Sequence, residues 1–431
     1  MKTLKTSLFT LTLCFSTLLS KAQLVTIPDA NFVTWLTANV PTAMSGNQMD
    51  TTDVAVTTTT HIMHVSHLNI SDLTGVQYFS SLTDLFCDSN YYLGVLPRLP
   101  NSLKKLSCVY SSMSSLPALP NSITYIDCSI NAIATLPTLP TSLLYLECSN
   151  GGLLTLPALP NLLTYLDCNS NGLLTLPTLP NSLKKIDCSN NNFLYNIPAL
   201  PSSLTYLNCD ADSISSLPAL PALLDTLICS GTYGNLTSLP ALPNSLRYLD
   251  CSYDSLTSLP VLPNSLVYLD CISNKLTSLP VLPNALKIFG CDYNMISCFP
   301  TFPNGLTYLD VYGNPFNCLP NYVAAMSSTL LAYPICAAGN SNGCPAPGTT
   351  AIKQNEADVA LKVYPNPASN VVTVELGSEN EELQVFDILG NEVIRLLLPY
   401  SKYDIDISSL QAGVYFMKTQ NAYLKIIKGQ K

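Results

Sequence analysis

The sequence predicts an α/β-type solenoid that is mainly β, followed by a small C-terminal antiparallel β-sandwich. Two observations predict the solenoid: a Leu-Pro-x-Leu-Pro motif recurs about every 20 residues, and leucine alternates with cysteine ahead of it. A third predicts the sandwich, because beyond residue 358 the chain breaks into short alternating segments separated by turn residues. The expected solenoid is an arc with a parallel concave sheet and a polyproline-like convex side.

The repeats are expected to occupy residues 61–335. One unit, residues 264–283, shows the skeleton L-x-x-L-x-C-x-x-N-x-L-x-x-L-P-x-L-P. Leu269 and Cys271 are two residues apart, so on a strand they share the inward face. One coil cannot bury its own leucines, but a stack of coils buries a continuous core. Copies of the motif begin at Leu96, Leu116, Leu136, Leu156, Leu176, Ile197, Leu217, Leu239, Leu259, Leu279 and Phe299, with a truncated copy at Leu319.

An asparagine three residues after the cysteine should form a ladder between coils, because its amide can bond neighbouring backbones. It recurs as Asn90, Asn131, Asn171, Asn191, Asn274, Asn294 and Asn314. Asp212 and Asp254 keep some of that capacity, and Ser111, Gly151 and Thr232 are weaker substitutes. The prolines favour extended backbone, so the return leg of each coil is expected to be polyproline-like.

Residues 1–22 have the pattern of an export signal. Lys2 and Lys5 precede an apolar run, and small residues allow cleavage after Ala22. The run is too short to span a bilayer comfortably, and no later stretch holds 18 uninterrupted apolar residues. The processed protein is therefore expected to be secreted or held at the cell surface without spanning a membrane.

Residues 23–60 are expected to form a cap over the open end of the core. Asp29 is placed to be the N-cap of a short helix. Phe32, Trp35 and Leu36 follow at helical spacing. Solenoids need such a lid, so this segment has a structural role.

Eleven of the sixteen cysteines occupy one repeat position: Cys87, Cys108, Cys128, Cys148, Cys168, Cys188, Cys209, Cys229, Cys251, Cys271 and Cys291. Parallel strands lie about 4.8 Å apart, whereas disulfide Cβ atoms lie about 3.8 Å apart, so buried free thiols are expected. Redox or metal roles and scattered disulfides are the alternatives. Cys298 and Cys318 share another register of the repeat. Cys336 and Cys344 lie in the exit segment, which we define as the residues that follow the truncated copy at Leu319, and either of them could form a disulfide whose partner the sequence does not specify.

The outward strand positions form two columns. The tyrosine column consists of Tyr125, Tyr145, Tyr165, Tyr206, Tyr248, Tyr268 and Tyr308. The acidic column consists of Asp127, Glu147, Asp167, Asp187, Asp250, Asp270 and Asp310. Lys105 and Lys185 interrupt the tyrosine column, and a third column is mostly small or polar, as in Ser129, Ser149, Asn169, Ser189, Ser230 and Ser252.

Two interpretations of these columns stay open. Tyrosine offers rigid amphipathic contact area, and stacked carboxylates repel one another unless a cation or basic partner relieves them. The face is then a docking surface for a protein or glycan. Alternatively, repeat duplication copied an ordinary soluble face, and tyrosine ladders stabilise the sheet.

Composition argues against several other functions. The net charge of -9 makes nucleic acid an unsuitable partner. The chain has no H-E-x-x-H, G-x-S-x-G, phosphate-binding loop or dinucleotide glycine run, and repeated acidic columns define no unique site. His61, His64 and His67 diverge on a strand, so they do not predict a metal site. No enzymatic activity, metal or cofactor is expected.

Composition changes again near residue 337. A flexible linker is expected at residues 336–357, and a separate domain at 358–431. The segments Val371–Leu376, Leu383–Leu389 and Gly413–Lys418 alternate as strands of a small antiparallel sandwich.

The repeat skeleton resembles the leucine-rich repeat family, in the short L-P-x-L-P subtype of secreted bacterial effectors. The resemblance covers residues 61–334, and an irregular unit at 68–76 resembles the internalin-type repeat. The family implies a curved solenoid that binds partners through its concave face. An alternative is a structural or adhesive surface spacer without a specific ligand.

The C-terminal motifs closely resemble the type A sorting domain of the type IX secretion system. They lie in order at residues 361–368, 385–391, 407–416 and 424–428. The resemblance implies a bacterium of the Bacteroidetes kind, engagement of the type IX secretion machinery, and passage through the outer membrane. It also implies frequent removal of this domain with attachment to surface lipopolysaccharide.

Overall fold

The computed structural model describes residues 23–232, 235–337, 362–366, 368–376, 381–387, 391–419 and 423–429. The chain divides into two compact units, Met1–Pro347 and Gly348–Lys431, and each is described by itself. The expected export signal at 1–22 and nearly all of the expected linker lie outside the described residues.

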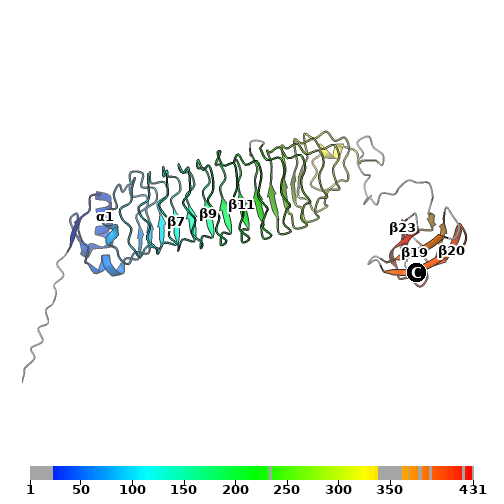
Figure 1. Cartoon of the computed structure of the whole chain (residues 1–431), viewed down its shortest axis with the longest axis horizontal. Helices are drawn as coiled ribbons and strands as arrows, with labels where there is room; N and C mark the ends of the chain where they lie inside the picture. Colours follow the sequence, from blue (N-terminus) through cyan, green and yellow to red (C-terminus); the bar gives the residue numbers. More distant parts are fainter. Residues whose placement is uncertain are drawn as a thin grey trace, which may run out of the picture. The chain divides into compact units, whose positions relative to one another are not determined.

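The N-terminal cap is built around α1 (Ala30–Asn39), which covers the first end of the repeat stack (Figure 1). Asp29 accepts a hydrogen bond from the Phe32 backbone nitrogen at 2.7 Å, which confirms it as the N-cap. Its other oxygen accepts bonds from the backbone nitrogen and hydroxyl of Ser71 at 2.8 and 2.7 Å. Asp29 therefore ties the helix to the first repeats, while Phe32 and Leu36 are fully buried.

Short elements complete the cap. The strands β1 (Leu24–Thr26), β2 (Met44–Ser45) and β3 (Gln48–Asp50) form an antiparallel sheet, accompanied by η1 (Pro41–Ala43) and a π-helical turn, η2 (Ala55–Thr59).

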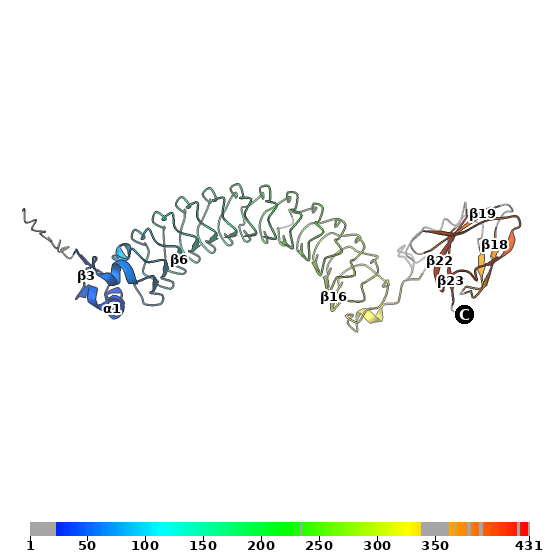
Figure 2. The same ribbon diagram turned by 90° about the horizontal axis from the view of Figure 1, so that it is seen from below.

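Thirteen strands of the repeats form one parallel sheet in which each strand pairs with its neighbours in sequence. They are β4 (Ile62–His64), β5 (Asp84–Phe86), β6 (Lys105–Ser107), β7 (Tyr125–Asp127), β8 (Tyr145–Glu147), β9 (Tyr165–Asp167), β10 (Lys185–Asp187), β11 (Tyr206–Asn208), β12 (Thr226–Ile228), β13 (Tyr248–Asp250), β14 (Tyr268–Asp270), β15 (Ile288–Gly290) and β16 (Tyr308–Asp310). Two short 3-10 helices, η3 (Val76–Tyr78) and η4 (Leu330–Ala332), lie near the ends of this series. Figure 2 shows the coils stacked into an arc with β6 and β16 toward its inner side.

The register follows the repeat. Tyr125 pairs with Tyr145, and Tyr145 pairs with Tyr165, so equivalent residues of successive coils stand side by side. In β5 to β15 the central residue of each strand points inward with the following cysteine: Leu166 and Cys168, for example, are fully buried. The Leu-Pro-x-Leu-Pro legs of the described coils carry no helix, as the prolines predict.

The asparagine ladder is confirmed. The Oδ1 atom of Asn274 accepts a bond from the Leu256 nitrogen of the preceding coil at 2.9 Å. Its Nδ2 atom donates to the carbonyls of Cys251 and Cys271 at 2.8 and 3.2 Å. Each amide therefore satisfies buried backbone groups of two coils at once.

One position per coil adopts a left-handed backbone, two residues after the ladder cysteine. It is occupied mostly by residues other than glycine, including Ile130 at φ 56°, Asn190 at 57° and Tyr253 at 58°. An L-residue pays roughly 1–2 kcal/mol for this conformation. Most coils therefore turn without glycine at a recurring local cost, whereas Gly231 and Gly313 occupy this position in two coils.

The ladder cysteines are eleven free, buried thiols, as expected. Their sulfurs lie near carbonyl oxygens of the next coil, as in the 3.4 Å contact between Cys148 Sγ and the Asp167 oxygen. Off the ladder, Cys318 and Cys336 form a disulfide, which confirms the expected involvement of Cys336. Cys298 is also disulfide-bonded.

The C-terminal unit contains two antiparallel sheets. One holds β17 (Lys362–Tyr364), β18 (Val371–Glu375) and β21 (Lys402–Asp406), and the other holds β19 (Glu381–Phe386), β20 (Glu392–Leu398), β22 (Gly413–Lys418) and β23 (Tyr423–Lys428). Val372, Val385 and Met417 from both sheets are fully buried in one core, which confirms the expected small antiparallel fold. Across the described parts of both units, no helix has the length and apolar character that crossing a bilayer requires.

Candidate binding surface

The strands place the two outward columns on one face because side chains alternate along extended backbone. In β9, Leu166 is fully buried, whereas Tyr165 and Asp167 beside it are half-buried and outward. The other members of both columns are likewise half-buried, except Tyr308, which is 50% exposed. The face therefore lies along the sheet on the inner side of the arc (Figure 2).

Most of the tyrosine column is stacked ring on ring. The centroids of Tyr125 and Tyr145 lie 4.5 Å apart, and those of Tyr145 and Tyr165 lie 4.1 Å apart. Tyr248 and Tyr268 stack at 4.0 Å. Such pairs contribute about 0.5–1.5 kcal/mol beyond their buried area, so these rings stiffen the face.

Lys185 continues the column instead of interrupting it. Its Nζ atom lies 5.2 Å from the ring centroid of Tyr165 and 4.5 Å from that of Tyr206, so it makes cation–π contacts on both sides. The column breaks elsewhere. Thr226 stands between Tyr206 and Tyr248, and Ile288 stands beside Tyr308.

The carboxylates are oriented by nearby hydroxyls and backbone. Asp127 Oδ1 accepts bonds from the nitrogen and hydroxyl of Ser129 at 3.1 and 2.7 Å, and Asp250 is held in the same way by Ser252. The Tyr145 hydroxyl donates to Glu147 Oε2 at 2.6 Å, which links the two columns within one strand.

The charge of the acidic column is not neutralised by ion pairs within the described repeats. There the ion pairs join Lys105 to Asp84 and Arg247 to Asp225, and neither acid belongs to the column. Burial raises the pKa values of Asp127, Asp167, Asp250 and Asp270, and neighbouring carboxylates raise them further. Positive charge brought to this face would relieve that repulsion.

Further acids lie in the third column, among its mostly small or polar residues. They are Asp88, Asp210 and Asp292. Burial and the neighbouring carboxyl of Asp310 raise the pKa of Asp292 to about 7. Alignment of the repeats at this single position would have revealed all three.

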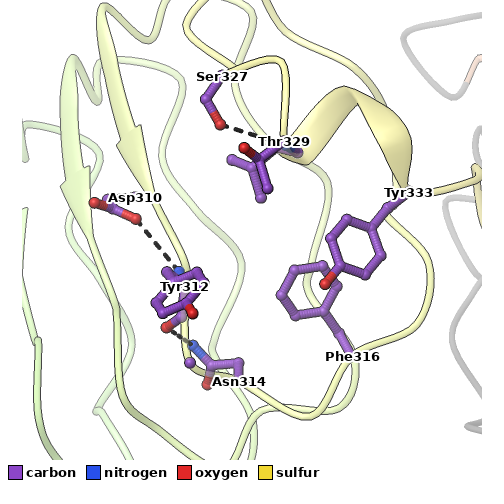
Figure 3. A pocket seen from close by; sticks show the side chains of 9 residues that line it. Asp310, Tyr312, Asn314, Phe316, Ser327, Thr329 and Tyr333 are labelled. Carbon is purple, nitrogen blue, oxygen red and sulfur yellow. Dashed lines mark hydrogen bonds between the residues drawn. The ribbon is translucent and has the colours of Figure 1, made fainter.

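A pocket of about 470 Å³ lies beyond the last strand of the sheet (Figure 3). Its wall includes Asp310 and Tyr312 from the last coil and Ser327 from the exit segment. The rings of Phe316 and Tyr333 pack at 4.6 Å on its other side. The repeat pattern does not predict this pocket, because the exit segment occurs only once in the chain.

The three histidines have separate environments. His61 Nδ1 lies 3.0 Å from the Ser81 carbonyl oxygen, and the ring of His64 stacks on Phe86 at 4.7 Å. Among the described residues, no group of three or more His, Cys, Asp or Glu side chains is arranged to hold a metal ion.

The repeats are similar to solved leucine-rich structures. YopM from Yersinia enterocolitica is 34% identical with a TM-score of 0.55, over 57% of this chain and 59% of that one, so this chain spans less than two thirds of that protein. YopM from Yersinia pestis, a leucine-rich effector protein, is 30% identical with a TM-score of 0.50, over 62% of this chain and 87% of that one. None of the curated proteins compared with the chain matches it.

The end of the chain matches a different family. Residues 362–429 match the secretion system C-terminal sorting domain, which marks secreted or outer-membrane surface proteins and implies contact with the type IX secretion machinery. The coils and this match together show that the chain belongs to the leucine-rich repeat family and is exported with a type IX sorting domain at its C-terminal end.

Proposed function

We propose that this exported protein recognises a protein or glycan through its tyrosine and acidic columns and catalyses no reaction. The observation that carries the proposal is a face of stacked tyrosines beside carboxylates that no lysine or arginine of the described repeats neutralises by an ion pair. The acids recur from coil to coil, a pattern that suits an extended contact better than a single reacting centre.

The energetics support a ligand with positive charge or hydrogen-bond donors. Stacked tyrosines lose little conformational entropy on binding because their rings are already held. The raised pKa values of Asp127 and Asp270 reflect burial and like charge. A basic or donor-rich partner would convert that repulsion into attraction.

We also propose the role of each segment. Residues 1–22 are a removed signal, 23–60 a cap, 61–335 the recognition repeats, 336–357 a linker, and 358–431 the sorting domain. Only the repeats would meet the ligand.

A structural spacer is the second candidate, and the tyrosine stacks favour it. Rings at 4.0 to 4.5 Å stabilise the sheet without any partner. In that case the columns would matter for stability alone.

An array of surface proteins and glycans probed with the exported chain tests the proposal. Tyr165→Ala combined with Tyr206→Ala should abolish capture of the bound spot. The matched control changes Tyr92 and Tyr195 to Ala, because both are exposed (75% and 54%) and lie off the strands. Equal capture by the column variant and the control would refute binding by this face and leave the spacer.

A further inference from the structure

We infer that the face contains a slot at Thr226 that receives an arginine or lysine side chain of a basic protein partner between the rings of Tyr206 and Tyr248. The inference rests on the proposed function and narrows it, because it selects a protein with an exposed basic segment over a neutral glycan. We call this place the Thr226 slot.

The protein itself contains the arrangement that the slot would reproduce. One strand earlier than Tyr206, Lys185 occupies the middle of a Tyr–x–Tyr series across β9, β10 and β11. Its ammonium group lies 5.2 Å and 4.5 Å from the two flanking ring centroids. A cation is therefore accommodated on this face by two tyrosines that stand two strands apart.

The slot repeats that spacing with a short threonine side chain at the middle rung. Tyr206, Thr226 and Tyr248 are equivalent residues of β11, β12 and β13 in continuous register. Adjacent strands lie about 4.8 Å apart, so the two tyrosines stand about 9.6 Å apart, as Tyr165 and Tyr206 do around Lys185. The threonine side chain is too short to fill the space between two rings.

The other rungs offer no comparable opening. Tyr125, Tyr145 and Tyr165 stack directly on one another. Between Tyr268 and Tyr308, the rung carries Ile288, a larger aliphatic side chain. Of the three tyrosine pairs separated by one rung, only the pair around Thr226 is separated by a small residue.

Three carboxylates lie near the slot, although Asn208 and Ile228 take the acidic-column positions of β11 and β12. Asp225 immediately precedes it, and its Oδ2 lies 3.4 Å from the Thr226 hydroxyl. Asp210 and Asp250, on the flanking coils, are close enough that the charge of Asp210 raises the pKa of Asp250. Arg247 pairs with Asp225 at 3.2 Å, which directs that guanidinium to one carboxylate and leaves Asp210 and Asp250 outside any ion pair of the described repeats.

This chemistry favours a guanidinium. Its plane can stack against aromatic rings on both sides while its edge donates to carboxylates. A neutral sugar supplies neither the charge nor the flat cation. The partner expected here is therefore a protein that presents an arginine, with lysine as a weaker substitute.

Hexa-arginine peptide is the probe for the test, with hexa-citrulline as the uncharged control, and the full chain is titrated at low ionic strength. Thr226→Tyr fills the slot with a ring and Thr226→Lys fills it with an internal cation. Thr226→Ser leaves it open. Both filling variants should weaken hexa-arginine binding about tenfold, which corresponds to about 1.4 kcal/mol. Thr226→Ser should bind as the parent does, and hexa-citrulline should bind weakly to all.

Each outcome separates the slot from the proposed function. Tenfold weakening in both filled variants, with circular dichroism unchanged, supports the slot. Parental affinity in Thr226→Tyr overturns it, whatever Thr226→Lys does, because the ring adds no charge. If array capture is lost on removing Tyr165 and Tyr206 but survives in Thr226→Tyr, the recognition face stands and the slot fails. If hexa-arginine binding depends on Thr226 while no array ligand depends on the tyrosines, the slot stands and the proposed function fails.

Discussion

Asp212 occupies an asparagine position of the buried ladder and should make the protein progressively less stable as pH rises from 5 to 9. Its Oδ1 accepts a bond from the Asn191 nitrogen at 2.7 Å, as ladder amides do. Its Oδ2 is buried without a hydrogen-bond partner, where the ladder register would place the donating amide group. Burial raises the pKa of Asp212 to about 8. Asp212→Asn supplies the missing donor and removes the ionisable group.

The pH dependence can be worked out from this shift. The folded pKa of about 8 lies above the ordinary pKa of 3.8 for an aspartate, so the folded state binds the proton more tightly. The contribution is therefore fully present below the unfolded pKa and is lost as pH rises through the folded one. Asp212 alone should lower the unfolding free energy by about 2.7 kcal/mol between pH 5 and 7 and by about 1.4 kcal/mol between pH 7 and 9. The advantage of Asp212→Asn should thus grow by about 4 kcal/mol from pH 5 to 9.

Urea unfolding at pH 5, 7 and 9, followed by the fluorescence of Trp35 and by circular dichroism, measures this difference. The parent also carries Asp254, whose pKa burial raises to about 7, so the quantity compared is the parent-to-variant difference. The reverse change, Asn274→Asp, removes an amide that donates to the carbonyl oxygens of Cys251 and Cys271 and puts a carboxyl group in its place. This variant should lose stability relative to the parent as pH rises. A parent-to-variant difference that stays constant with pH would refute the argument.

Two further predictions concern the coil itself. Ile130 is a β-branched residue with a left-handed backbone, φ 56°, and is 47% exposed. Ile130→Asn should raise the free energy of unfolding by about 1 kcal/mol, because asparagine tolerates the left-handed conformation. An unchanged or lower urea midpoint would contradict this. The eleven ladder thiols are buried, and burial raises the pKa of thiols such as Cys148. They should therefore resist a chromogenic thiol reagent in the native protein, and all eleven should react once the protein is unfolded without reductant. Fewer than eleven reactive ladder thiols would show that disulfides link the coils.

Sequence periodicity and capping chemistry predicted which side chains of the strands face inward or outward and where the cap helix begins. The inward pair Leu269 and Cys271, the side-by-side tyrosines and the N-cap Asp29 all follow from spacing two on a strand or from capping chemistry. The directions in which individual side chains extend could not be predicted from the repeat spacing. The sequence showed Lys185 as a gap, whereas its flexible stem brings the ammonium group between two rings.

The unpartnered Oδ2 of Asp212 was also not predicted. An aspartate and an asparagine have the same shape, but only the amide can donate a hydrogen bond to the carbonyl oxygens at this position. The pairing of Cys318 with Cys336 and the pocket near Tyr333 come from the exit segment. That segment occurs once, so no comparison between coils could reveal its fold.

A uniform ladder cannot by itself position a ligand, because a partner shifted by one coil would make the same contacts. Register must come from the irregular coils. Irregular coils lie near both ends of the sheet, in β4 to β6 and in β15, and also in its middle, where Lys185 and Thr226 replace tyrosines and Asn208 and Ile228 replace acids. The spacing of ladder cysteines lengthens to 21 residues before Cys209 and to 22 before Cys251 in this central stretch, and to 21 before Cys108 near the start of the series. The regular coils would supply contact area and charge, while this central stretch would decide where along the arc a partner stops. In the proposed recognition, the departures from the repeat would therefore carry more of the specificity than the repeat does.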